Sequence, residues 1–475
     1  MRKLFAFISV LFVLPLAAQD AGAVRQLQKL TQVYRYLNGL YVDEVDMQPL
    51  VESAITGMLE DLDPHSAYIG ADEMKGVQES FEGEFSGIGV EFNILRDTVI
   101  VVNTIVGGPA ERVGVQPNDR IVRIDTLDAV GFKQTDVPKY LRGKTGSKVE
   151  IDVVRQGEPE PLHFVIVRDK IPLNTVDAAY MAADGVGYVK VNRFGRTTMP
   201  EFREAYRKLG KPGALILDLR GNGGGVIDVA FKMADAMTPE KDVYLGGVRW
   251  REDMGGLEQT YSTGGALPLN RIIVLVDGGT ASAAELLAGS LQDNGLTTLV
   301  GEPTYGKGQG QFHLDLVNGD KLVITTLVME LPRQGQYEGA GLVPDIRLEN
   351  RTVTVRADAL APLDTGGTLR FGEQSDQVYA MTERLSLLGL LKEPSRVFDR
   401  VVLDAVAAFA ESYEMGSLLH ASPDLLAALE QAMQTLNGET YVIDDQLQLA
   451  VEMGKLAAEK PQQYTPLPDG SWKAK

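Results

Sequence analysis

The sequence of 475 residues contains no cysteine and only four histidines. Disulfide bonds, thiolate nucleophiles, cysteine-ligated metals and a lipid-modified cysteine are therefore excluded. No histidine stands in an H-E-x-x-H pattern, so a zinc protease site built on histidines is not supported, and we expect neither a metal nor a cofactor. His65, which follows Pro64, is interpreted as a turn residue.

The chain also lacks an excess of positive charge. It has 46 lysines and arginines against 65 aspartates and glutamates, a formal net charge of −19. Nucleic acid is therefore not expected as a partner, and no extended basic patch would attach the protein to an anionic membrane. Long apolar runs are equally scarce: the one at residues 4–16 is shorter than the roughly 20 residues that a membrane-spanning helix needs.

This apolar run is typical of a secretory signal peptide. Arg2 and Lys3 precede it, and small residues follow it. Cleavage is expected after Gln19 or after Ala23, so residues 1–23 are predicted to be the signal and the protein to be periplasmic or extracellular. An uncleaved signal that keeps the protein at the membrane is the alternative.

Hydrophobic periodicity divides the remaining chain into four regions. Residues 24–82 carry apolar side chains at helical spacing, and residues 83–170 form short strands separated by turns. In residues 171–350 strands alternate with helices, which predicts a mainly parallel, layered α/β core. Residues 351–475 are predicted to be helical. The predicted fold class is therefore a multidomain α/β protein.

Two segments of the last region, residues 422–436 and 444–458, share leucines at helical spacing after an acidic start. We interpret them as helices for packing or for formation of a homo-oligomer. The proline-containing stretch 460–475 is predicted to be a flexible tail.

The most informative stretch of the core is residues 271–311. An apolar run at 272–276 turns on glycines into a helical segment that contains Ser282, and Lys307 lies on the loop after the next apolar run. Open α/β sheets place their sites at the carboxyl ends of such strands. We therefore hypothesise a serine nucleophile with a lysine base.

Each of these two residues has another interpretation. Ser282-x-x-Glu285 is a helix capping box. Lys307 lies in a pattern close to a Walker A phosphate loop, but Gly308 stands where that loop needs a hydroxyl residue to bind Mg²⁺. Both alternatives remain open from the residues alone.

Two glycine-rich loops are candidates for binding negative charge. The first precedes the first strand of residues 83–170 and makes that region resemble a PDZ domain, in which backbone N–H groups bind a peptide's terminal carboxylate. Its candidate residues are Phe85, Gly87, Ile88 and Gly89, and a β-bulge or tight turn is the alternative. The second, around Gly224, follows a buried strand but does not fit the dinucleotide-binding pattern.

Several motifs occur in a fixed order behind the PDZ-like region: Asp-Leu-Arg-Gly-Asn-x-Gly-Gly at 218–225, Gly-Thr-Ala-Ser-Ala-Ala-Glu at 279–285, Gly-Lys-Gly-x-x-Gln at 306–311 and Gly-x-x-Pro-Asp at 341–345. Over roughly residues 30–350 the chain resembles the carboxyl-terminal processing peptidases, tail-specific serine proteases of the S41 type. The segment 329–337 departs from that family, because it lacks the usual tyrosine-threonine-proline run.

The resemblance implies a role for each matched residue. Ser282 would be the nucleophile, Lys307 its general base and Gln311 the residue that orients the lysine. The backbone N–H groups of Gly224 and Ala283 would form the oxyanion hole. Because only a neutral lysine can accept a proton, its surroundings would have to lower its pKa.

The function implied is that of a secreted or periplasmic serine endopeptidase whose PDZ domain recognises protein or peptide substrates by their free C-termini. An adaptor protein is a further partner to consider. The alternative is a catalytically inactive PDZ scaffold that binds protein C-termini.

Overall fold

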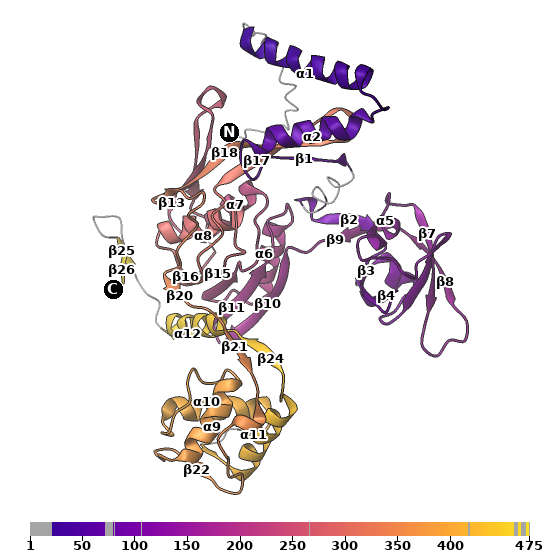
Figure 1. The fold of residues 1–475 in the computed structure, drawn as a ribbon. Coiled ribbons are helices and arrows are strands. Elements are labelled where there is room, and N and C mark those ends of the chain that lie inside the picture. The colour runs from indigo at the N-terminus through magenta and orange to yellow at the C-terminus, as the bar shows by residue number, and fades with distance from the viewer. Residues whose placement is uncertain are drawn as a thin grey trace. The chain divides into compact units, whose positions relative to one another are not determined.

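The computed structural model describes residues 21–71, 79, 81–105, 107–265, 267–416, 419–459, 464–466 and 472–474. The chain forms two compact units (Figure 1). One comprises Met1–Gly70 with Phe312–Thr325, and the other comprises Ala71–Gln311 with Thr326–Lys475. Residues 1–20 of the predicted signal and most of the predicted tail lie outside the described residues.

The smaller unit is built on two helices, α1 (Ala21–Leu40) and α2 (Met47–Glu60). Asp46 caps α2 by accepting a hydrogen bond from Gln48 N. After α2 the Asp63 carboxylate accepts from the backbone N–H groups of His65 and Ser66, so His65 lies in a turn as interpreted. β1 (Ala67–Ile69) then pairs with the start of β18.

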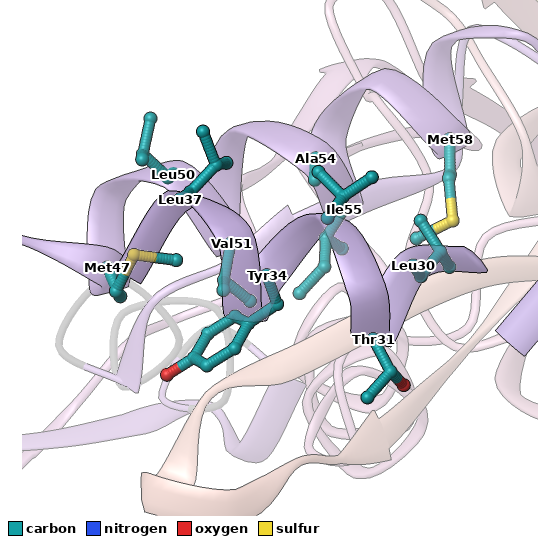
Figure 2. Close-up of a pocket in the computed structure, with 11 residues that line it drawn as sticks. Leu30, Thr31, Tyr34, Leu37, Met47, Leu50, Val51, Ala54, Ile55 and Met58 are labelled. Atoms are coloured by element: carbon teal, nitrogen blue, oxygen red, sulfur yellow. The ribbon is translucent and has the colours of Figure 1, made fainter. Parts of the chain in front are cut away.

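An apolar groove of about 400 Å³ runs between these two helices (Figure 2). Several large apolar side chains on them stay exposed; Leu40, for example, is 77% exposed. Among the described residues no helix is both long enough and apolar enough to cross a membrane. The groove is lined by Leu30, Thr31, Val33, Tyr34, Leu37, Met47, Leu50, Val51, Ala54, Ile55 and Met58.

Residues 83–170 form the predicted β-rich region. An antiparallel sheet runs in the order β3-β4-β5-β7-β8 with β6 on β5, and β2 pairs with β9. In β7 the buried residues alternate with less buried ones, as expected for a sheet with one face on a core. The elements are β2 (Glu84–Gly87), β3 (Val90–Leu95), β4 (Thr98–Thr104), α4 (Pro109–Val113), β5 (Arg120–Ile124), β6 (Leu127–Asp128), α5 (Val137–Leu141), β7 (Lys148–Val154), β8 (Leu162–Val167) and β9 (Asp169–Pro172).

The core of the larger unit is a six-stranded sheet, parallel from β11 to β20, which confirms the predicted layered α/β arrangement. One face packs under α6, α7 and α8, and the other packs under α12. Because both faces are covered, the central strands β12 and β15 are almost entirely apolar and buried. The elements are β10 (Val176–Ala183), β11 (Val186–Val191), α6 (Thr198–Lys208), β12 (Ala214–Asp218), α7 (Ile227–Met237), β15 (Arg271–Val276), α8 (Ala283–Asp293), β16 (Thr297–Gly301), β20 (Ile346–Arg347) and α12 (Asp445–Glu459).

A second, antiparallel sheet was only partly predicted. The apolar and β-branched residues at 321–328 predict a strand, which is present as β18, but the pattern of residues 241–263 predicts neither β13 nor β14. β13 contains the Gly246-Gly247 pair, and β14 is mostly polar. Neither segment therefore shows the hydrophobic pattern by which strands are predicted. The elements are β13 (Lys241–Trp250), the 3₁₀ helix η1 (Glu252–Met254), β14 (Leu257–Thr263), β17 (Gln309–Asp315), η2 (Val317–Gly319), β18 (Lys321–Leu331) and β19 (Gly335–Gln336).

The C-terminal region is helical, as predicted. α9, α10 and α11 enclose a hydrophobic core of their own, and the leucines of α11 point into it. Leu447 and Leu449 of the second segment pack on the parallel sheet, while Leu456 is 69% exposed, and a homo-oligomer through these segments stays a prediction. The elements are β21 (Arg351–Thr354), η3 (Ala357–Ala359), β22 (Leu369–Arg370), α9 (Asp376–Leu387), α10 (Arg400–Ser412), β23 (His420–Ala421), α11 (Pro423–Thr435), β24 (Thr440–Ile443), β25 (Tyr464–Pro466) and β26 (Trp472–Ala474).

Candidate active site

Ser282 lies directly before α8, at the carboxyl end of the central strand β15. Its backbone has φ 57° and ψ −121°, a conformation that residues other than glycine rarely adopt. Such strain costs roughly 1–3 kcal/mol and persists only where the surrounding structure imposes it. The side chain is 9% exposed. Ser282 is thus held in a fixed, nearly buried position at the sheet edge where a site was predicted.

A buried carboxylate, that of Glu285, joins the loop of Ser282 to the loop of Lys307. One of its oxygens, Oε2, accepts hydrogen bonds from Ser282 N at 2.9 Å and from Lys307 N at 2.8 Å. The other, Oε1, accepts from Gly306 N and from the hydroxyl of Thr304. The predicted capping box is present, and its glutamate also fixes a loop 22 residues away. The structure therefore brings Ser282 and Lys307 together.

The loop that carries Lys307 is held by its two flanking glycines. A Cβ on Gly306 would lie 2.8 Å from Gly341 N, and a Cβ on Gly308 would lie 2.8 Å from Glu338 N. The carboxylate of Glu338 also accepts from Gly308 N at 2.7 Å. No helix follows this loop, since β17 begins at Gln309, so the loop does not have the structure of a phosphate-binding loop.

Gln311 lies on β17, four residues beyond Lys307, and both side chains are half-buried. Gln311 is thus the third residue of the strand that follows the lysine loop, and its role in orienting the lysine stays a prediction.

Tyr337 is a site residue that the sequence did not indicate. Its fully buried hydroxyl donates a hydrogen bond to Ser282 O at 3.4 Å. Burial, together with the negative charges of Glu285 and Glu338, raises the pKa of Tyr337 well above its usual value. The hydroxyl therefore stays protonated and can act as a donor to the strained serine backbone.

Gly224 lies against Ser282, on the loop that follows the neighbouring strand β12. A Cβ on Gly224 would lie 2.7 Å from Ser282 Cβ and 2.9 Å from Ala283 N, so only glycine fits there. Gly224 and Ala283, whose N–H groups are predicted to form the oxyanion hole, thus lie close together in space. In this structure Gly224 N donates to Asn222 Oδ1 at 2.9 Å, so an oxyanion would replace that acceptor.

Asn222 is buried and holds this loop in place. Its side-chain Nδ2 donates to Val191 O, and its backbone oxygen accepts from Ala281 N. The Asn inside the motif at 218–225 was the only sequence signal for this role. Within the described ranges, no group of three or more histidine, aspartate or glutamate side chains is arranged to hold a metal ion.

The PDZ-like region contains a separate small pocket of about 90 Å³. Phe85 and Gly87 lie on β2, while Gly89, with φ 73°, forms the turn into β3. The side chain of Ile88 is 2% exposed and packs in the core of the region, so only its backbone is available to a ligand. The pocket is lined by Phe85, Gly87, Ile88, Gly89, Val90, Phe92, Pro138, Leu141 and Arg142.

Three family profiles match the chain. They describe peptidase family S41 at residues 185–348, a PDZ domain at residues 86–164 and the N-terminal domain of the activating protease CtpB at residues 15–73. The class of protein that they define is a serine peptidase of family S41 that carries a PDZ domain.

Individual relatives extend over most of the chain. A carboxy-terminal-processing protease of Bartonella bacilliformis is 31% identical over 363 residues, which are 73% of this chain and 83% of that protein. The carboxy-terminal processing protease CtpB of Bacillus subtilis is 30% identical over 410 residues, 84% of each chain. Among solved structures, the photosystem II D1 C-terminal processing protease is 26% identical, with a TM-score of 0.40, and the match covers 70% of this chain and 94% of that one. The chain belongs to the carboxy-terminal processing proteases, which are serine endopeptidases.

The position of Glu285 leads to a first prediction. Glu285→Gln keeps the shape of the side chain but turns one oxygen into an NH₂ group that faces two donors. Each buried donor left without an acceptor costs about 1–3 kcal/mol, so we expect a lower melting temperature and a loss of peptidase activity. Thermal unfolding and a peptide-cleavage assay would measure both, with Glu302→Gln on the same loop as control. Wild-type activity in Glu285→Gln would show that this carboxylate does not organise the site.

Proposed function

We propose that this protease cleaves peptide bonds with Ser282 as nucleophile, Lys307 as general base and Gln311 as the residue that orients the lysine. The observation that supports this most is the shared carboxylate of Glu285, which holds the backbone N–H groups of both Ser282 and Lys307. The strained backbone of Ser282 adds to it, because strain of this kind gathers at active sites.

In the proposed reaction the neutral amine of Lys307 takes the proton of the Ser282 hydroxyl while Oγ attacks the peptide carbonyl carbon. The N–H groups of Gly224 and Ala283 stabilise the negative oxygen that forms. When the C–N bond breaks, Lys307 gives the proton to the leaving amine. A water molecule, deprotonated by the same lysine, then hydrolyses the acyl-enzyme and restores Ser282.

The test compares the wild-type protein with Ser282→Ala and Lys307→Ala on an unfolded protein substrate. We expect each variant to lose cleavage by about 10³-fold or more, because nucleophile and base act as one unit. Lys232→Ala is the matched control, since Lys232 is 61% exposed on α7, where it pairs with Asp228. Cleavage by Lys307→Ala at the wild-type rate would exclude the lysine as base.

We further propose that the PDZ domain binds the free C-terminus of the substrate at the loop of residues 85–89. The glycines at 87 and 89 allow backbone N–H groups to converge on a carboxylate, and the adjoining pocket of about 90 Å³ suits a small apolar side chain. An inactive scaffold is not favoured, because Ser282, Lys307 and Gln311 are all present.

Binding of a tail peptide to the Ser282→Ala variant tests this role without cleavage. Hydrogen bonds to a charged group contribute about 1.5–3 kcal/mol, so amidation of the peptide's C-terminus should weaken binding roughly 10- to 100-fold. Fluorescence anisotropy of two labelled peptides that differ only in that group would measure the change. Equal affinities would exclude carboxylate recognition.

We also propose that the chain is exported, on the basis of Arg2, Lys3 and the apolar run at residues 4–16. In a Gram-negative host the protein should be recovered in the periplasmic fraction. Its intact mass should be that of a chain that begins at residue 20 or 24. Replacement of Leu11 and Leu14 by arginine should leave full-length protein in the cytoplasm. A full-length mass in the wild-type periplasmic or membrane fraction would instead support the uncleaved anchor.

A further inference from the structure

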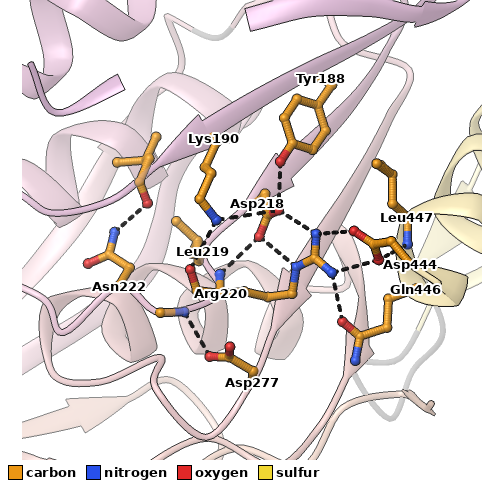
Figure 3. A network of polar contacts seen from close by, with 12 residues as sticks. Tyr188, Lys190, Asp218, Leu219, Arg220, Asn222, Asp277, Asp444, Gln446 and Leu447 are labelled. Atoms are coloured by element: carbon orange, nitrogen blue, oxygen red, sulfur yellow. Dashed lines mark hydrogen bonds and ion pairs between the residues drawn. The ribbon is translucent and has the colours of Figure 1, made fainter. Parts of the chain in front are cut away.

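One arginine of the α/β core, Arg220, connects the C-terminal region to the start of the proposed oxyanion loop. This residue stands two positions after β12 and directly before the glycine loop at 221–225 (Figure 3). Its partner Asp444 lies 224 residues further along the chain, at the start of α12. The sequence pattern of the region that contains Asp444 predicted only helices for packing or for a homo-oligomer.

All five N–H donors of the Arg220 guanidinium are used. Nε and Nη2 donate to the two carboxylate oxygens of Asp218 at 2.9 and 2.6 Å. Nη1 and Nη2 donate to the two oxygens of Asp444 at 2.7 and 2.8 Å, and Nη1 also donates to Gln446 Oε1. Such double forks fix the position of a guanidinium far better than a single ion pair does.

The end of this cluster at Asp218 is nearly closed to solvent, whereas the Asp444 side chain is 38% exposed. Asp218 is fully buried and also accepts from the hydroxyl of Tyr188, while the Arg220 side chain is 14% exposed. Burial acts to raise the pKa of Asp218, but its hydrogen bonds to Arg220 and Tyr188 and the arginine's charge outweigh it and lower the pKa. Without Asp444, the arginine would keep the carboxylate of Asp218 and the amide of Gln446 but lose two of its five side-chain hydrogen bonds.

On its other side, Arg220 is continuous with the oxyanion loop. Its own N–H donates to Asp218 Oδ1, and the next residue, Gly221, donates to the carboxylate of Asp277. One residue later comes Asn222, which accepts from Gly224 N. The Gly224 amide thus lies on a short run of backbone, residues 220–224. The first residue of this run, Arg220, is held in place by its side chain.

We propose that Arg220 and Asp444 form a positioning pair: α12 of the C-terminal region sets the geometry of the glycine loop that supplies the oxyanion donor. The pair touches neither substrate nor reacting atoms. This inference rests on the proposed serine mechanism. It makes the C-terminal region a part of the catalytic core rather than an appended helical domain.

The chain offers a matched pair of variants, Asp444→Asn and Asp445→Asn. Asp444 also caps α12 by accepting from Leu447 N, and asparagine caps helices as well as aspartate does, so Asp444→Asn removes the double fork without removing the cap. The neighbouring Asp445 makes an equivalent fork with Arg351, whose other side-chain hydrogen bonds go to Lys392 O and Leu391 O. Asp445→Asn is therefore the control for the loss of a buried ion pair alone.

Two measurements decide the proposal. In steady-state cleavage, Asp444→Asn should lower kcat about tenfold or more with little change in KM, a part of the 10²–10³-fold lost when an oxyanion donor is removed. Arg220→Lys, which cannot fork to both carboxylates, should behave in the same way. Asp445→Asn should keep kcat within about twofold of the wild-type value, even if its melting temperature falls as much as that of Asp444→Asn.

Amide hydrogen exchange gives a readout that does not depend on cleavage. Exchange in a peptide that covers residues 219–226 should be faster in Asp444→Asn than in the wild type, and unchanged in Asp445→Asn. Equal exchange and equal kcat in the two variants would overturn the positioning role. Failure of the wild type itself to cleave would contradict the serine mechanism, and the exchange experiment would still decide whether the pair orders the loop.

Discussion

The active site depends on one buried carboxylate. Glu285 is fully buried, and a charge in that position is stable only if it is fully hydrogen-bonded. Four donors meet this requirement, and they come from the turn after β15 and the loop after β16. The cost of burying the charge thus forces two loops of neighbouring parallel strands into one arrangement. The proposed nucleophile and base lie on those loops.

The cap and the nucleophile, which the sequence presented as alternatives, are compatible in the structure. The capping box uses the backbone N–H of Ser282 and the carboxylate of Glu285. The same contact keeps the serine backbone in its unusual conformation, and the hydroxyl of Tyr337 supports it from the other side. A structural role of the motif is therefore compatible with the catalytic role that we propose for Ser282.

The parallel sheet explains why the C-terminal region belongs to the core. An α/β sheet of this kind needs helices on both faces. Three of them, α6, α7 and α8, come from the segments between the strands, but the opposite face is covered by α12 from the far end of the chain, as Figure 1 shows. Once α12 lies on the sheet, Asp444 at its start lies beside Arg220 at the end of β12, next to the glycine loop.

The sequence by itself determined most of the local elements, though not β13 and β14, and the identity of the motif residues. Apolar runs such as residues 272–276 and helical spacings such as residues 422–436 are encoded within a few residues, so strands, helices and the sites at strand ends could be predicted. The motifs also indicated the family. Only the tertiary structure decided that Glu285 joins two loops, that Tyr337 lies under Ser282 and that Asp444 meets Arg220. These contacts join residues 22, 55 and 224 positions apart, and such pairings depend on how whole elements pack, which no local pattern of residues encodes.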